Sequence, residues 1–529
     1  MKKQKSSSSL NLVAFVPAMI ILAIFLIVGF LSQDKLATFL DTLFVGLTDN
    51  LGWYINLLAL FCLILILVFV IYKYGDIRIG GKDAKPEFKT FNWCAMTICS
   101  GIGTGLLFWG MGEPIYHFMQ PPVAANVEPG SRSAAIFAVS QAMWGWSFVQ
   151  YAIYTLIAVA FAVVTYNLKK KLSFGSLIEG IFKRKIPWLE SLIHGILILC
   201  MCLAMANSMG VGLLQIAAGL EAAFHIPQSA IIFAVIAVIM AVVFILSCVS
   251  GLGTGLKKIS SITIYLFIAL MVYVLIFGDT QFIGKITAEA FGDLLNNMPS
   301  KTTILNTMAP SDTWSADWIL QYWCQFFVFG TLIGMFLSRM AKGRTVREFV
   351  LVNVLVPSLF CCIWIGIFGG MTISLQINGI VDVWEAVNTL GMQTTIFQII
   401  GSLPFGSIIT LIFLVTICFS FCTLADPMAS AVSTISIRNA SVNDEPPRKI
   451  KILVGVIMTA AAFIQVESGG TSNVRGMYIV IGIITSFIVI LCVTAAFKFC
   501  HQCVDKANWG VTDRLEGDVL KKSSSDDIS

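Results

Sequence analysis

The chain has 529 residues, of which 57% are hydrophobic and only 12% are charged. Soluble domains carry about 25% charged residues, so this composition excludes a soluble globular protein and indicates an integral membrane protein. The formal net charge of +5 requires no nucleic-acid partner, because membrane topology by itself accounts for an excess of basic residues in loops.

Hydrophobic residues are gathered into twelve blocks, each roughly the length of the ~20-residue helix that crosses a bilayer. The first block follows a basic start, but it is longer than the hydrophobic region of a signal peptide and has no clear cleavage site. We therefore expect it to be retained as a helix. The predicted spans are 12–31, 53–72, 91–111, 134–166, 192–220, 229–248, 259–278, 318–340, 350–371, 405–424, 452–466 and 477–499.

The order of the spans assigns their connections to alternate sides of the membrane. On this basis 29 of the 34 Lys and Arg residues lie on the side of both termini, and five lie on the other. Cytoplasmic loops carry the excess of Lys and Arg, so the sequence predicts that both termini are cytoplasmic. Two stretches of mixed polarity, 286–298 and 381–392, fall on the opposite side, where we expect helices at the external interface.

Three alternate glycines lie in the middle of the third span, at Gly101, Gly103 and Gly105. Glycine weakens a helix, and a helix broken near the midplane bares N–H and carbonyl groups that bind substrates or ions in transporters. Small residues also let helices pack closely. The pattern leaves both interpretations open.

Aromatic residues cluster inside two spans, away from the membrane interfaces. Trp146, Tyr151 and Tyr154 lie in the fourth span, and a second group lies in the eighth. In a continuous helix Trp146 points about 140° away from Tyr151, so spacing alone does not establish an aromatic box. Such a box would suit a quaternary ammonium, which ring faces attract; packing against lipid or helices is the alternative.

Two acidic residues, Glu113 and Asp426, lie in or beside hydrophobic blocks, and each is followed by a proline. An ionisable residue inside a membrane indicates a functional site. The prolines, however, favour helix ends near an interface at both places, so a capping or loop role is as well supported as ion coupling.

The sequence argues against an enzyme. The fourteen cysteines lie mostly in the hydrophobic blocks without metal-binding spacing, so we expect small buried side chains rather than disulfides or metal ligands. No nucleophile elbow, Walker loop or dinucleotide fingerprint occurs in a loop able to form a soluble site. Four scattered histidines also make a membrane-embedded metalloenzyme a poor alternative.

Several motifs resemble those of the betaine/carnitine/choline transporter family. The most specific is GMFLSRMAKGRTVREF at 334–349, and another is GIGTGLLFWG at 101–110, followed by Glu113 and Pro114. Shorter matches occur at 76–78, 85–88, 212–216, 250–255 and 367–370. The resemblance thus covers nearly the whole chain after the first span.

This resemblance implies an all-α integral membrane protein of twelve helices, in which two peripheral helices precede a LeuT-like core of two inverted five-helix repeats. It implies a secondary active transporter that works by alternating access and is often a homotrimer. The implied divisions are an N-terminal part (1–90), the first repeat (91–280), an external helix with the second repeat (281–500), and a short cytoplasmic tail (501–529).

The resemblance also places a substrate between the broken third span and the eighth span. The implied substrate-binding residues are Gly101, Gly103, Gly105, Trp146, Tyr151, Tyr154, Trp323, Gln325, Phe326 and Phe329. The family carries a run of tryptophans in the eighth span, of which this chain keeps only Trp323, and Gln325 points to a substrate with an added polar group. Choline-carrying members tend to have an aspartate at the position of Gly105, so a zwitterion such as glycine betaine or carnitine is implied.

Sodium-coupled members resemble one another in a Thr-Ser-Ala-Asp-Ser run late in the tenth span, which reads TLADP at 423–427 here. One hydroxyl ligand is lost. The remaining implied ion-binding residues are Cys99, Ile102, Ser420 and Thr423. Sodium-independent members have an arginine where this chain has Thr263 and Ile264, so Na⁺ is favoured as coupling ion. Exchange of betaines, or a sodium-coupled amino-acid carrier of the same fold, are the alternatives.

Overall fold

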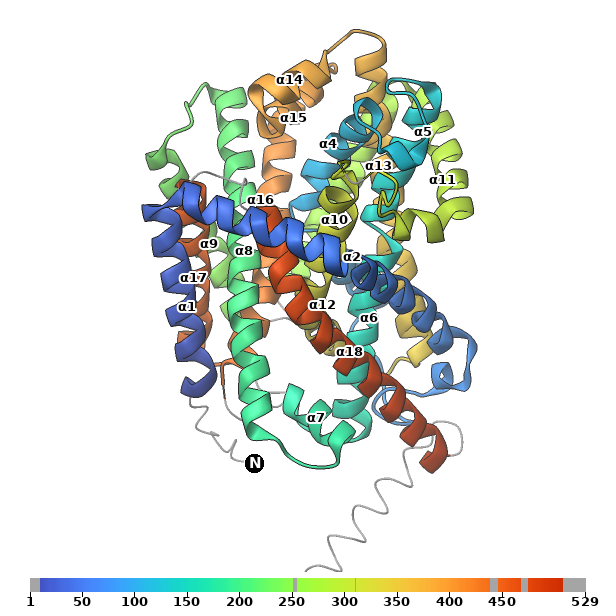
Figure 1. Ribbon diagram of the computed structural model, residues 1–529, viewed down its shortest axis with the longest axis vertical. Coiled ribbons are helices and arrows are strands. Elements are labelled where there is room, and N and C mark those ends of the chain that lie inside the picture. The colour runs from blue at the N-terminus through green and yellow to red at the C-terminus, as the bar shows by residue number, and fades with distance from the viewer. Residues whose placement is uncertain (1–9, 251–254, 310, 438–445, 468–473, 508–529) are drawn as a thin grey trace, which may run out of the picture.

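The computed structural model of the protein describes residues 10–250, 255–309, 311–437, 446–467 and 474–507. These residues form a bundle of helices (Figure 1), and the β pairing among them is limited to two isolated bridges. Most of the predicted cytoplasmic tail at 501–529 lies outside the described residues.

Twelve spans follow from the described helices. Eleven are long and apolar enough to cross a membrane, and the bent pair α3 and α4 makes the twelfth, as the sequence predicted. They are α1 (Leu12–Leu31), α2 (Gln33–Ile71), α3 with α4 (Thr90–Ile102, Gly105–Met119), α5 with α6 (Arg132–Gly145, Phe148–Ala162), α8 (Pro187–Phe224), α9 (Ala230–Ser250), α10 (Lys257–Phe277), α12 (Gln321–Ser338), α13 (Val346–Ile377), α16 (Gly406–Ile435), α17 (Arg448–Glu467) and α18 (Val474–Ala507).

Helix α2 is the largest departure from the predicted boundaries. It begins at Gln33, twenty residues before the predicted start at Trp53, because the more polar stretch 33–52 continues the helix. Its 39 residues make a helix of about 58 Å, almost twice the thickness of a hydrocarbon core. The helix therefore crosses the bundle obliquely, as Figure 1 shows.

Four further helices lie between the spans: α7 (Phe174–Phe182), α11 (Thr280–Thr303), α14 (Val383–Leu390) and α15 (Met392–Gly401). Helices α14 and α15 lie at the opposite end of the molecule from α7 (Figure 1). Helix α11 packs beside α5 and α13. The two stretches expected to form interfacial helices are thus helical. Helix α11 extends well beyond the predicted 286–298 at both ends, and α14 lies within the predicted 381–392.

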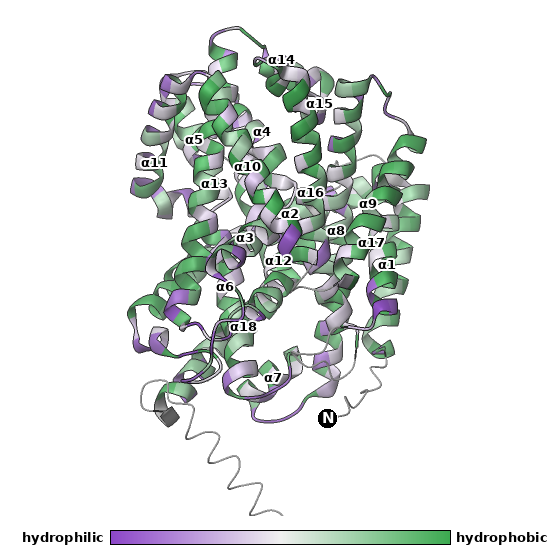
Figure 2. Ribbon diagram, turned by 180° about the vertical axis from the view of Figure 1, so that it is seen from behind, coloured by the Kyte–Doolittle hydropathy of each residue, from purple (hydrophilic) through white to green (hydrophobic). Residues whose placement is uncertain are grey.

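Burial divides the spans into a central and a peripheral set. Helices α5, α6 and α12 are mostly buried, whereas only about a third of the residues in α1, α9 and α10 are buried. Apolar side chains such as Ile24 in α1 and Ile231 in α9 are exposed, and hydrophobic colouring covers these outer helices in Figure 2. An exposed apolar belt of this kind faces lipid. All fourteen cysteines are free, and all but Cys94 and Cys418 are buried.

Two of the sequence motifs meet at one end of the bundle. The stretch after α2 pairs with the stretch before α13 through main-chain bonds from Ile79 N to Arg344 O (2.9 Å) and from Gly343 N to Ile79 O (2.8 Å). Arg78 also donates to the carbonyl of Gly343 at 2.8 Å. Gly343 has φ +81°, and a Cβ there would lie 2.2 Å from the main chain of Lys85, so only glycine fits.

Candidate functional site

The third span is broken in the middle, which is one of the two interpretations that its glycines left open. Helix α3 ends at Ile102 and α4 begins at Gly105, with a bend of 58° between them. Gly103 sits in the break with φ 53° and ψ −150°, a conformation that a side chain disfavours. The break frees carbonyl groups at the end of α3, and N–H groups at the start of α4, from helical bonding.

The fourth span contains a second break, which the sequence analysis did not predict. Trp146 closes α5, Ser147 has φ −125° and ψ −119°, and α6 starts at Phe148. The ring of Trp146 lines the same cavity as Tyr154, whereas Tyr151 does not line it. The aromatic box that spacing alone left open thus contains two of these three rings.

Two of the three glycines let aromatic rings approach the broken helix. A Cβ at Gly105 would lie 2.6 Å from the Trp146 ring, and a Cβ at Gly101 would lie 2.6 Å from the Tyr151 ring. Both interpretations of the glycine pattern therefore hold. Gly103 breaks the helix, and its two neighbours allow close packing.

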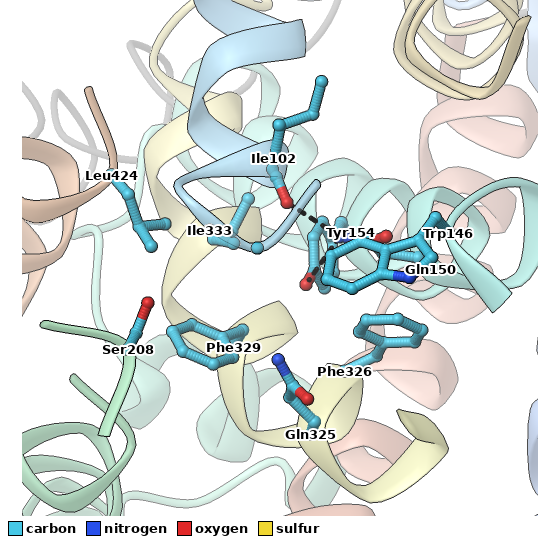
Figure 3. Close-up of a pocket in the computed structure, with 12 residues that line it drawn as sticks. Ile102, Trp146, Gln150, Tyr154, Ser208, Gln325, Phe326, Phe329, Ile333 and Leu424 are labelled. Carbon is cyan, nitrogen blue, oxygen red and sulfur yellow. Dashed lines mark hydrogen bonds between the residues drawn. The ribbon is translucent and has the colours of Figure 1, made fainter. Parts of the chain in front are cut away.

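A cavity with about 340 Å³ of empty space lies between the broken third span and α12. Figure 3 shows Trp146, Gln150 and Tyr154 on one side and Ser208 and Leu424 on the other. Its lining residues are Gly101, Ile102, Gly105, Trp146, Gln150, Tyr154, Ser208, Gln325, Phe326, Phe329, Ile333 and Leu424. Four of them are aromatic, and together they offer ring faces to a bound molecule.

Seven of the ten residues proposed for the substrate line this cavity, and three do not: Gly103, Tyr151 and Trp323. The Tyr151 hydroxyl is within 3.6 Å of Cys361 Sγ, and its ring packs on Gly101 behind the lining. Trp323 is fully buried and donates its indole N–H to the carbonyl of Thr302 at 3.3 Å. Both rings thus support the residues that face the cavity.

Gln150 and Ser208 are lining residues that the sequence analysis missed. The Gln150 amide donates to the carbonyl of Gly101 at 2.8 Å, which caps a group freed by the break in the third span. It also lies 3.3 Å from the Tyr154 hydroxyl. A polar amide in the middle of a hydrophobic span, four residues before Tyr154, was the signal in the sequence.

Glu113 lies at the centre of a buried hydrogen-bond network beside the cavity. Its Oε2 accepts from Trp146 Nε1 at 2.8 Å and from the Tyr322 hydroxyl at 2.7 Å, while Oε1 lies 3.1 Å from His117 Nε2. Trp314 Nε1 donates to His117 Nδ1 at 3.1 Å. Because an indole only donates, Nε2 of His117 carries the proton and donates to Glu113.

The expected helix ends at the two acidic residues are wrong. Glu113 is 1% exposed inside α4, and Asp426 is 5% exposed inside α16, with Pro114 and Pro427 both within the helices. Proline is tolerated in a membrane helix because its neighbours satisfy the freed carbonyl. Asp426 accepts a hydrogen bond from Ser247 at 2.5 Å.

An aromatic layer covers the network on the side of α14. Trp318 packs edge-on against Trp109 (5.4 Å between ring centroids) and His117 (4.8 Å), and Tyr116 lies 5.6 Å from both Trp318 and Trp384 of α14.

Of the four residues proposed for ion binding, Ser420 is in direct contact with the break. It donates to the carbonyl of Gly103 at 2.6 Å, whereas Thr423 donates within its own helix, to the carbonyl of Ser420 at 2.7 Å. Ile102 ends α3 and lines the cavity, and Cys99 Sγ contacts the carbonyl of Ser260 at 3.6 Å. The Ser420 hydroxyl and the Gly103 carbonyl are oxygens of the kind that hard cations prefer.

Known proteins similar to this chain are transporters. The chain is 27% identical over 503 residues to an ectoine/hydroxyectoine transporter of Virgibacillus pantothenticus, with 95% of this chain and 99% of that one covered. It is 29% identical over 476 residues to a probable glycine betaine transporter of Desulfitobacterium hafniense strain Y51, with 88% and 92% covered.

A solved structure of a Na⁺-coupled sialic acid symporter in a substrate-bound outward-open state is similar at a TM-score of 0.44 and 13% identity, over 84% of this chain and 87% of that one. At this distance the similarity carries no argument about substrate or coupling. Residues 13–503 match the profile of BCCT, the betaine/carnitine/choline family transporter. A match of this extent shows that the chain belongs to the betaine/carnitine/choline transporter family.

Proposed function

We propose that the protein is a secondary active transporter of a zwitterionic quaternary-ammonium solute, of the glycine betaine or carnitine type, and not an enzyme. The observation that carries the proposal is the aromatic cavity at the break of the third span, lined by Trp146, Tyr154, Phe326 and Phe329. Ring faces attract an ammonium group that has no proton to donate, by about 0.5–2 kcal/mol per ring.

The carboxylate of such a zwitterion is proposed to bind at the start of α4. The N–H groups that begin a helix are not used within it and carry a partial positive charge, which favours an anion. Gly105 brings this backbone to the cavity without adding a side chain. Among the relatives, the probable glycine betaine transporter agrees with this class of solute, and a choline transporter shares the quaternary ammonium group.

Sodium is the proposed coupling ion. The carbonyl of Gly103 at the break of the third span and the Ser420 hydroxyl that bonds to it support this choice, and Thr423, Cys99 and Ile102 are proposed to contribute further oxygens. Sodium-independent exchange of betaines and sodium-coupled transport of ordinary amino acids remain the alternatives. Competition between glycine and glycine betaine distinguishes the amino-acid carrier from a betaine transporter, because an amino-acid carrier prefers a primary amine.

The wider organisation is proposed from topology and family membership. The excess of Lys and Arg on one side supports a plasma-membrane protein with both termini in the cytoplasm. Residues 91–280 and 281–500 are proposed to contain two inverted repeats that move relative to each other. A peripheral part at 1–90 precedes the repeats in the chain, and a tail at 501–529 follows them. A homotrimer is proposed from the family alone.

Uptake into proteoliposomes tests the proposal. Radiolabelled glycine betaine and carnitine are supplied with and without an inward sodium gradient, to the wild type, to Trp146→Ala and to Trp188→Ala. Trp188 is 68% exposed and far from the cavity lining, so it serves as the matched control. Sodium-driven accumulation that only Trp146→Ala abolishes is expected. Uptake that requires preloading with a betaine would indicate exchange, and uptake of neither solute would refute the substrate class.

A further inference from the structure

Helix α12 has one partly accessible face. Every residue of α12 is buried except Gln321 and Gln325, which lie one helical turn apart and therefore on the same face. Gln325 lines the cavity, whereas Gln321 does not. The neighbours of Gln325 along the helix, Cys324 and Phe326, are buried. The exposed part of the Gln325 side chain is therefore the part that faces the cavity.

The Gln325 amide faces the cavity without a protein partner. Figure 3 shows it pointing between the rings of Phe326 and Phe329, on the opposite side of the lining from Ile102 at the helix break. The side chain makes no hydrogen bond to any residue that the structure describes. An amide has both donor and acceptor groups. A molecule that displaces water from the cavity must therefore pair with this amide or leave it unsatisfied at a cost in affinity.

The other polar side chains of the lining are engaged or turned away. Gln150 and Tyr154 are each 2% exposed, and the Gln150 amide donates to the Tyr154 hydroxyl at 3.3 Å. The Ser208 hydroxyl points towards Leu424 in Figure 3. Gln325 is therefore the polar side chain of the lining that is best placed to bind a third group of the substrate.

Neither end of the proposed zwitterion pairs with Gln325. The quaternary ammonium lies against the aromatic rings and has no proton to donate, and the carboxylate is assigned to the start of α4, at Gly105. Gln325 is left to face the carbon chain that joins the two ends. A hydroxyl on that chain both donates and accepts, so it can pair with either atom of the amide. A methylene in its place leaves the amide unpaired.

We propose that Gln325 binds a hydroxyl group that lies between the ammonium and the carboxylate of the substrate. The cavity then prefers hydroxylated quaternary-ammonium zwitterions to their deoxy analogues, and Gln325 sets this preference. The inference rests on the proposed function, because it assumes that the cavity binds a quaternary-ammonium zwitterion. It narrows the solute to the hydroxylated members of that class, of which carnitine is one and glycine betaine is not.

Two ligands that differ by a single oxygen atom test the preference. L-carnitine and γ-butyrobetaine share the same ammonium, carboxylate and chain length, and γ-butyrobetaine lacks only the hydroxyl. Each competes, in proteoliposomes that contain the full chain, with radiolabelled glycine betaine or radiolabelled L-carnitine, whichever is taken up. A hydrogen bond that only carnitine makes implies about a tenfold lower half-inhibitory concentration for carnitine in the wild type.

Three variants identify the residue responsible. Gln325→Met removes the amide at similar side-chain length, and the ratio of the two half-inhibitory concentrations is expected to fall to about onefold. Gln325→Leu removes the amide with a different apolar shape and serves where Gln325→Met does not fold. Gln321→Met is the matched control. It makes the same change one turn away on the same face of α12, outside the lining, and is expected to keep the wild-type ratio.

Equal inhibition by the two ligands in the wild type would overturn the inference. An undiminished ratio in a folded Gln325 variant would also overturn it, as would a ratio that Gln321→Met abolishes equally. Uptake of neither labelled solute refutes the proposed function itself. Uptake of glycine betaine or carnitine without any preference for the hydroxyl refutes this inference alone.

Discussion

Trp146 makes two kinds of contact at once. Its ring lines the cavity, while its indole N–H donates to Glu113 at 2.8 Å. Tyr322 donates to the same carboxylate at 2.7 Å. Because Trp146 lies at a helix break, helical geometry alone does not fix its ring, and the hydrogen bond to Glu113 does. Glu113 is therefore a positioning residue for the surface that faces the cation.

Glu113→Gln is expected to raise KM about tenfold with little change in kcat. The Glu113 carboxylate accepts hydrogen bonds from Trp146, Tyr322 and His117. The amide of glutamine has only one acceptor oxygen, so at least one of these hydrogen bonds is lost, at a cost of about 1.5–3 kcal/mol. Initial rates of uptake over a range of substrate concentrations measure both constants. Glu128, an exposed acid, gives the control Glu128→Gln. A lower kcat at unchanged KM would contradict a positioning role.

The two helix breaks differ in how visible they are in the sequence. The first break coincides with three alternate glycines. The second, at Trp146 and Ser147, has only Gly145 beside it, and a Cβ there would lie 3.0 Å from the Tyr322 ring and 3.3 Å from Glu113. The second break thus depends on contacts with α4 and α12, which no local pattern reveals.

Gly105→Ala is expected to displace the Trp146 ring and raise KM at least tenfold, since the new Cβ would lie 2.6 Å from that ring. The matched control is Gly284→Ala in α11, where a Cβ meets no atom within 4 Å. That change is expected to leave transport unchanged and to stabilise the helix by up to about 1 kcal/mol. Equal effects of the two variants on KM would count against a steric cause.

Helix α11 carries an ion pair between two of its own residues, Lys301 and Asp293. Lys301 is 3% exposed, lies 2.9 Å from Asp293, and sits over the ring of Phe137 at 4.5 Å. Asp293→Asn leaves this cation unpaired, so a loss of about 3 kcal/mol is expected, and Lys301→Met should cost less. Thermal unfolding in detergent compares them with Glu289→Gln, whose partner Arg132 is exposed. A Lys301→Met variant less stable than Asp293→Asn would refute this account.

The same pair predicts sensitivity to acid. Burial raises the pKa of Asp293, but the nearby Ser140 hydroxyl, the charge of Lys301 and the Asn297 amide together lower it below its ordinary value of 3.8. Stability from this carboxylate is therefore present above about pH 4 and lost as pH falls through the lower folded-state pKa. The unfolding temperature should fall more between pH 5 and pH 3 in the wild type than in Asp293→Asn.

At the scale of the whole molecule, block length was enough to predict twelve spans, whereas the glycine pattern left a break and close packing equally open. The aromatic positions of the cavity came from family resemblance, since the spacing of Trp146, Tyr151 and Tyr154 alone did not establish a box. The contacts of Gln150 could not be predicted, because a single polar residue in a span does not reveal its partner. Glu113 was misplaced because Pro114 was taken as a helix end, although α4 continues through it.

The orientation of the bundle in the membrane gives a last test. Helix α7 lies at one end and α14 at the other (Figure 1), and the distribution of Lys and Arg predicts that the α7 end is cytoplasmic. The exposed positions Lys183, after α7, and Thr389, in α14, are suited to cysteine substitution. Native cysteines are mostly buried, so background labelling is low. A membrane-impermeant maleimide added to intact cells should label Thr389→Cys, and it should label Lys183→Cys only after the membrane is permeabilised. The reverse labelling pattern would show that the predicted orientation is wrong. The aromatic layer beside α14 would then lie on the cytoplasmic side and not on the external side.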